Sequence, residues 1–103
     1  GHAIEACSEF KISHGHAVAL GMRVITASAE KAGLCEAGCA KAIERILTEY
    51  GFPLQVPYTA EALCQAALKD KDEITLILPK RIGQCYTHTI PTQNLFTWIQ
   101  NGL

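Results

Sequence analysis

The sequence predicts a mainly α-helical fold, a bundle-like set of helices that carries one small β-hairpin. Four stretches repeat apolar residues at helical spacing and are bounded by residues that start or stop helices. One short run, Ile-Thr-Leu-Ile-Leu at 74–78, is β-branched and bounded by charge and proline, as is typical of a strand. The 103 residues, 49% of them hydrophobic, predict a single domain with a core, residues 1–103.

The longest predicted helix begins after Ser13, which can cap it, and ends at Gly33. Its predicted inward face is a stripe spaced at i, i+4, i+7 and i+11: Val18, Met22, Ile25 and Ala29. Small residues crowd the rest of its surface: Ala17, Ala19, Gly21, Ala27 and Ser28. Because small side chains let neighbours come close on several sides, we expect this helix to be central and mostly buried.

A second helix is predicted over residues 36–50, where apolar residues keep the helical period. Gly51 supplies a stop signal and Pro53 follows it, which is a common way for a helix to end. Residues 52–58 contain two prolines and predict an extended connector.

A shorter helix is predicted over residues 60–68, with Thr59 as its cap. Its inward residues are expected to be Leu63, Ala66 and Ala67. The polar sequence Lys-Asp-Lys-Asp-Glu that follows predicts a loop.

The strand at 74–78 is expected to turn through residues 79–83 and return as a second strand near 84–88. Because a two-stranded hairpin is marginal alone, it must pack on the helices. A last helix is predicted from Thr92 to Gly102, with three residues inward: Leu95, Phe96 and Ile99.

Charge and hydropathy exclude several function classes. A net charge near −1 gives no electrostatic case for binding nucleic acid or an anionic membrane. The apolar runs are too short to span a bilayer, and nothing indicates a secretory signal, so we expect a cytoplasmic protein. Because the chain begins at Gly1 and its one methionine, Met22, lies inside an apolar pattern, we expect a piece of a longer protein.

The cysteines favour free thiols in a reducing compartment. Their number is odd and their spacing is not that of a disulfide scaffold: Cys7, Cys35, Cys39, Cys64 and Cys85. Cys35 and Cys39 could share a helix face, but no second pair of metal-binding residues accompanies them at zinc-finger distance. We expect them to be small buried hydrophobes.

Three histidines lie near the start of the chain. His14 falls in the first turn of the predicted central helix, where free backbone amides favour a neutral imidazole that can bind a metal or transfer a proton. His16 is turned roughly 200° from it on a helix, so the pair cannot chelate one ion. Gly15 and Gly21 are easier to explain where a ligand, a metal or another backbone comes close. For His2 or any of the three, a structural role is the alternative.

Two motifs together resemble the C-terminal domain of 3-dehydroquinate synthase. They are G-H-A-I-E at 1–5 and H-G-H-A-V-A-L-G-M at 14–22, where the family pattern has H-G-E-A-V-A-x-G-M. Weaker matches follow in order, Asp-Lys at 70–71, Leu-Pro at 78–79 and Ile-Gly at 82–83. The resemblance covers nearly the whole chain.

The resemblance implies different roles for the histidines. His14 matches a metal ligand of the family, and the two other ligands would precede Gly1. His2 matches an active-site histidine that lies near the substrate phosphate and is assigned to proton transfer. Lys71 resembles a substrate-binding lysine, although the loop is shorter than the family's, so Lys69 stays open as the alternative.

The implied activity is that of a carbon–oxygen lyase of the shikimate pathway, in aromatic amino acid biosynthesis. It converts a seven-carbon sugar-acid phosphate to 3-dehydroquinate with Zn²⁺ or Co²⁺ and with NAD, and NAD would be held by an N-terminal domain that this chain lacks. The fragment alone is expected to be inactive, and the parent is expected to be a homodimer. Alternatives are a related sugar-phosphate cyclase, a metal-dependent alcohol or glycerol dehydrogenase, or a non-catalytic helical interaction module.

Overall fold

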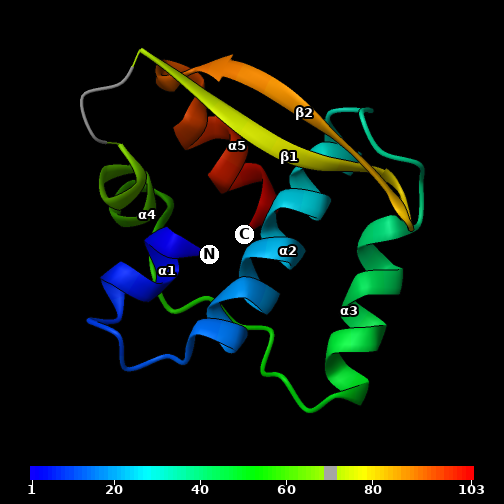
Figure 1. Cartoon of the computed structure of the whole chain (residues 1–103), viewed down its shortest axis with the longest axis horizontal. Helices are drawn as coiled ribbons and strands as arrows, with labels where there is room; N and C mark the ends of the chain where they lie inside the picture. Colours follow the sequence, from blue (N-terminus) through cyan, green and yellow to red (C-terminus); the bar gives the residue numbers. More distant parts are fainter. Residues whose placement is uncertain (69–71) are drawn as a thin grey trace.

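The computed structural model describes residues 1–68 and 72–103, and its helices and one hairpin confirm the mainly α class (Figure 1). A central helix is surrounded by shorter helices, and the hairpin lies across one side. In chain order the elements are α1 His2–Cys7, α2 His14–Lys31, α3 Cys39–Glu49, α4 Ala60–Ala67, β1 Glu73–Arg81, β2 Gln84–Pro91, a 3-10 turn Thr92–Asn94, and α5 Leu95–Gly102.

Helix α2 is the longest element and the centre of the molecule, as predicted. Helices α1, α3 and α5 and strand β1 all pack on it. The hydroxyl of Ser13 accepts a hydrogen bond from the backbone N–H of His16, which confirms the predicted cap. The helix ends at Lys31, and Gly33 then adopts a left-handed conformation with φ of 75°.

The predicted inward stripe of α2 is wrong in its first half. Val18 and Met22 are 39% and 47% exposed, although Ala29 is buried as expected. The buried side of this helix is instead centred on Ala17, Leu20, Val24 and Ser28. These residues also follow the helical period, but two of them are small, so periodicity of large apolar residues points to the wrong face.

The two helices between α2 and the hairpin lie close to where the sequence predicts them. Helix α3 begins three residues later than expected, after Gly38, and ends just before Gly51, whose φ of 82° provides the stop. The hydroxyl of Thr59 accepts a hydrogen bond from the backbone N–H of Ala62 and so caps α4. The connector between α3 and α4 is extended.

The strands pair in antiparallel fashion, with Leu76 opposite His88, and both run longer than predicted. The turn is confined to Ile82 and Gly83, and Gly83 has a φ of 87°. Leu78 is fully buried against the helices, which confirms that the hairpin packs on them. Phe96, predicted to face inward from α5, is 44% exposed and is a correction.

In the described part of the chain, most of the larger buried side chains belong to three clusters. One joins α1, α2 and α4, a second joins α2 to the start of α3 and the hairpin, and a third joins α4, α5 and the hairpin. Their buried members are, in that order, Ile4, Ala17, Leu20 and Leu63; Ala29, Cys35, Cys39 and Leu78; and Cys64, Ile90 and Leu95.

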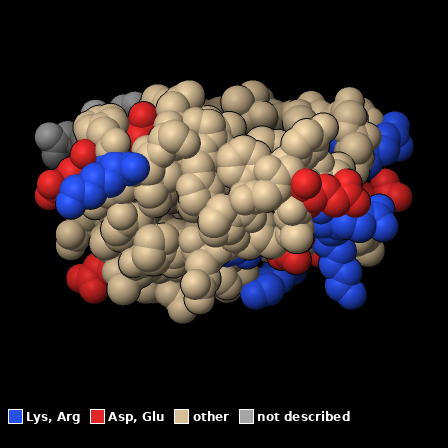
Figure 2. Space-filling model, turned by 90° about the horizontal axis from the view of Figure 1, so that it is seen from below, with Lys and Arg blue, Asp and Glu red and all other residues tan. Residues whose placement is uncertain are grey.

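Charges are mixed on the face seen from below in Figure 1. Figure 2 shows Lys and Arg side chains near Asp and Glu side chains toward both ends of this face, with other residues across its middle. In the described part of the chain, no helix is long and apolar enough to cross a membrane.

Candidate functional site

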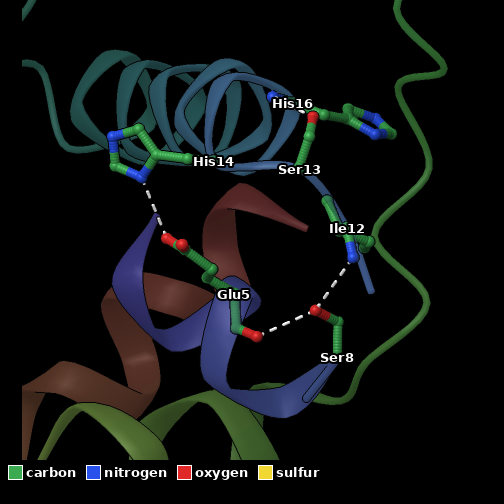
Figure 3. Close-up of polar contacts among 6 residues, drawn as sticks. All are labelled: Glu5, Ser8, Ile12, Ser13, His14 and His16. Atoms are coloured by element: carbon green, nitrogen blue, oxygen red, sulfur yellow. Dashed lines mark hydrogen bonds and ion pairs between the residues drawn. The ribbon is translucent and has the colours of Figure 1, made fainter. Parts of the chain in front are cut away.

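The loop between α1 and α2 folds back tightly and brings the two helices together. The Ser8 hydroxyl donates to the carbonyl of Glu5 at 2.8 Å and accepts from the backbone N–H of Ile12 at 3.2 Å (Figure 3). Glu9 and Phe10 adopt left-handed backbone conformations, with φ of 54° and 63°, which reverse the chain. As a result, one side of α1 lies beside the first turn of α2.

Glu5 and His14 form a direct contact across this junction. A carboxylate oxygen of Glu5, Oε2, lies 3.0 Å from Nδ1 of His14 (Figure 3). The imidazole of His2 lies beside them, with its ring centre 6.5 Å from that of His14 and the planes tilted by 56°. His2 and Glu5 are three residues apart on α1 and therefore share a face of that helix. We refer to these three residues as the His2–Glu5–His14 cluster.

Exposure differs within the cluster. The Glu5 side chain is 17% exposed, whereas that of His14 is 66% exposed. A carboxylate can only accept a hydrogen bond, so Nδ1 of His14 carries the hydrogen in this contact. In the neutral ring the lone pair is then on Nε2, and among the described residues nothing forms a hydrogen bond with that atom.

His16 points the other way from α2, as its spacing from His14 predicts (Figure 3). Its Nε2 lies 3.1 Å from the carbonyl oxygen of Pro53, and its ring centre lies 5.7 Å from that of Phe52. These contacts join the start of α2 to the extended connector, which gives His16 a structural role.

The two glycines of α2 differ in how closely other atoms approach them. A side chain at Gly21 would place its Cβ 2.7 Å from the backbone nitrogen of Gly1, so here another backbone does come close. At Gly15 a Cβ would meet nothing within 4 Å among the described residues, so no protein neighbour explains that glycine.

The cluster fits a role as part of a metal site. His14 offers a ring nitrogen toward solvent and is held from behind by a carboxylate, which is the usual arrangement around a metal-binding histidine. Within residues 1–68 and 72–103, however, no group of three His, Cys, Asp or Glu side chains could hold an ion. The described residues therefore do not form a complete site of three such ligands, and His14 could contribute one ligand to a larger site.

Cys35 and Cys39 are buried beside Ala29 and Leu78, as expected of small hydrophobes. Burial, aided by a hydrogen bond to Cys39, raises the pKa of the Cys35 thiol from 9.0 to about 12. A metal-binding cysteine must be a thiolate, so this environment is unfavourable for a metal.

The remaining predicted residue, Lys71, and its alternative Lys69 lie outside the described residues. None of the three residues of the cluster lines either of two surface cavities. A cavity of about 350 Å³ is lined by Arg23, Glu44 and the connector, and one of about 290 Å³ lies between the start of α3 and the hairpin turn. Within the His2–Glu5–His14 cluster, the two histidines are exposed and Glu5 is half-buried.

Glu5 is the residue that sequence reasoning missed. It belongs to the first motif but was given no role. Its spacing of three residues from His2 could have indicated that the two side chains share a helix face. Its closeness to His14 depends on the loop between α1 and α2, which the sequence does not predict.

Comparison with known proteins identifies the family. Residues 1–73 match the family described as 3-dehydroquinate synthase C-terminal. The chain belongs to the 3-dehydroquinate synthase C-terminal family. This confirms the resemblance carried by the two histidine motifs.

Individual 3-dehydroquinate synthases are similar over most of the chain. That of Streptococcus sanguinis is 38% identical over 101 residues, which cover 92% of this chain and 28% of that protein. That of Dictyoglomus thermophilum is 43% identical over 89 residues, 82% of this chain and 25% of that protein. That of Clostridium perfringens is 39% identical over 94 residues, 85% of this chain and 27% of that protein. The chain thus spans about a quarter of the length of these relatives.

Proposed function

We propose that this chain is the C-terminal, metal-binding part of an enzyme with 3-dehydroquinate synthase activity. The enzyme eliminates phosphate from a seven-carbon sugar-acid phosphate and closes the carbon ring, as a lyase of the shikimate pathway. The observation that carries the proposal is the His2–Glu5–His14 cluster, which joins both family motifs at the junction of α1 and α2.

Three residues of this chain have a proposed task in the reaction. His14 contributes one imidazole nitrogen to the metal site, because Nε2 faces outward while Nδ1 is engaged by Glu5. His2, whose ring centre lies 6.5 Å from that of His14, is near enough to transfer a proton to or from a substrate held at the metal. Lys71 binds an anionic group of the substrate. When bound, the metal supplies Lewis-acid polarisation and NAD supplies reversible oxidation.

The remaining parts of the site lie in the residues of the relatives that this chain does not span. They comprise the other metal ligands and the NAD-binding domain, so the chain alone is inactive under this proposal. The open surface around His14 fits such a division, because the cluster forms one wall of a site whose facing wall is supplied from elsewhere. The proposal extends to a cytoplasmic enzyme that works as a homodimer.

The test uses the full-length protein that contains these residues. His14→Ala should abolish binding of one divalent ion per chain, measured by metal analysis after dialysis, and should abolish phosphate release from the substrate. His16→Ala is the matched control, because that histidine lies two residues away on the other side of α2. It should retain the metal.

A second variant separates the two histidines of the cluster. His2→Ala should keep the metal but lose phosphate release, because His2 is assigned to proton transfer rather than to ligation. If the His14→Ala protein holds as much metal as the unmodified protein, the assignment of His14 is wrong. If both variants also retain full activity, the histidines are structural and the domain is a non-catalytic module.

A further inference from the structure

We propose that Glu5 is a positioning residue for His14, which fixes the imidazole with its hydrogen on Nδ1 so that Nε2 is presented to the metal. This inference rests on the proposed function for the identity of the ligand, but the contact itself is a property of this chain. No motif assigned Glu5 a task, and it touches neither substrate nor metal under the proposal. It acts through His14 alone.

The geometry favours a directed contact over a chance surface pair. The carboxylate oxygen lies 3.0 Å from Nδ1, and the Glu5 side chain is much less exposed than that of His14. Glu5 follows Ile4, whose side chain is buried in the hydrophobic core with Ala17 and Leu20. This packing fixes the position of the backbone at Glu5. The carbonyl of Glu5 is in addition held by the Ser8 hydroxyl. A largely buried acceptor therefore meets an exposed ring.

A fixed acceptor matters because a neutral imidazole has two tautomers and its ring can rotate. Only rings with a free lone pair on Nε2, oriented outward, can bind a metal in this arrangement. When the competent form is a fraction of the total, the apparent dissociation constant rises in inverse proportion to that fraction. Loss of such a supporting carboxylate typically weakens metal binding by about 10–100-fold.

A merely structural role predicts something different. If the Glu5–His14 contact only joined α1 to α2, removing it would lower the melting temperature and free the His14 tautomer, but it would leave the intrinsic affinity for metal unchanged. The affinity is therefore the decisive measurement, and the tautomer, which needs no metal, tests the contact through which Glu5 is proposed to act.

The tautomer is measured by long-range ¹H–¹⁵N NMR of the metal-free 103-residue chain. The spectra are recorded in mildly alkaline buffer and compared between variants at one and the same pH. His14 is expected to carry its hydrogen on Nδ1, and in Glu5→Ala this signal should shift toward the Nε2–H form. His16, whose Nε2 faces the Pro53 carbonyl, should remain Nε2–H in every variant and is the internal control.

The affinity is measured with Zn²⁺ or Co²⁺ in the full-length protein, by competition with a chelator. Glu5→Ala should raise the dissociation constant about 10–100-fold. Glu49→Ala removes an exposed glutamate at the end of α3 and should leave it unchanged. Glu5→Gln keeps the size of the side chain and loses its charge, so it should weaken binding in the same direction even if Glu5→Ala disturbs α1.

The outcomes separate this inference from the proposed function. A His14 ring that carries its hydrogen on Nε2, or that does not change in Glu5→Ala, overturns the positioning role whatever the metal does. Unchanged affinity in both Glu5 variants, while His14→Ala loses the metal, overturns it and leaves the proposed function standing. If His14→Ala keeps the metal but the tautomer depends on Glu5, the ligand assignment fails and Glu5 orients a ring with another task.

Discussion

The buried face of α2 can be tested by removing two side chains of similar size from the same helix. Leu20 is fully buried against Ile4, Ala17 and Leu63, whereas Met22, two residues later, is 47% exposed. Large-residue periodicity predicts that Met22 is the inward residue, and the structure places Leu20 there. If the structure is right, Leu20→Ala should destabilise the protein more than Met22→Ala. If the periodicity of large residues is right, Met22→Ala should be the more destabilising.

The expected difference follows from burial. Leu20→Ala removes the isopropyl group from a fully buried site, which at roughly 0.8 kcal/mol per carbon is about 2.4 kcal/mol of lost transfer free energy. The cavity left behind adds to this, so a total of about 3–4 kcal/mol is expected. Met22→Ala leaves no enclosed cavity and removes a half-exposed side chain, so about 1 kcal/mol is expected. Helix propensity changes little and similarly in both variants.

Urea unfolding of the 103-residue chain, followed by circular dichroism, measures both values. A free energy of unfolding of about 5–15 kcal/mol is typical of a domain, so Leu20→Ala should remove a large part of it. The slope of the transition should stay the same, since both variants unfold from the same fold. A loss for Met22→Ala equal to or greater than that for Leu20→Ala would refute the placement of the buried face.

Three further predictions concern a helix cap and the cysteine thiols. Ser13→Ala should lower the free energy of unfolding by about 1 kcal/mol, because the backbone N–H of His16 loses its acceptor, whereas Ser13→Asp should retain most of the stability in the same urea measurement. Among the thiols, iodoacetamide followed by mass spectrometry should label the exposed Cys85 first and leave buried Cys35 unmodified at neutral pH. Because the folded pKa of Cys35 is raised, its contribution to stability is complete below about pH 9 and should be lost as the pH rises toward about 12, which a pH series of unfolding curves would detect.

Local signals in the sequence predicted where most elements begin and end. Ser13 and Thr59 accept the backbone hydrogen bonds expected of caps, and Gly51 and Gly83 adopt the left-handed conformation expected at a helix end and a hairpin turn. These features depend on a few consecutive residues, so they can be read without knowing the rest of the fold.

The direction in which a helix faces could not be predicted in the same way. Val18, Met22 and Phe96 have the spacing and chemistry of inward residues and are exposed. Which side of α2 is buried is decided by where α1, α3 and α5 pack on it, and small residues such as Ala17 and Ser28 fill the closest approaches. Tertiary packing of this kind leaves little trace in a list of large apolar residues.

The candidate site shows the same division between local and tertiary information. The motifs identified His2 and His14 as residues of interest, and spacing separated His14 from His16. The contact of His14 with Glu5, in contrast, depends on the loop between α1 and α2, where Glu9 and Phe10 have positive φ values that few non-glycine residues adopt. No rule of propensity predicts such a turn, so Glu5 had no role in the sequence interpretation.

The position of the Glu5–His14 contact also connects the stability of the core to the site. Ile4, adjacent to Glu5, and Ala17, three residues after His14, are both buried in the cluster that includes Leu20. Packing of these side chains sets how closely α1 approaches α2, and therefore sets the 3.0 Å separation between the carboxylate and the imidazole. Because interiors are densely packed, a cavity under this junction would be relieved partly by movement of α1. The geometry proposed to hold His14 thus depends on buried residues that have no proposed contact with a metal or a substrate.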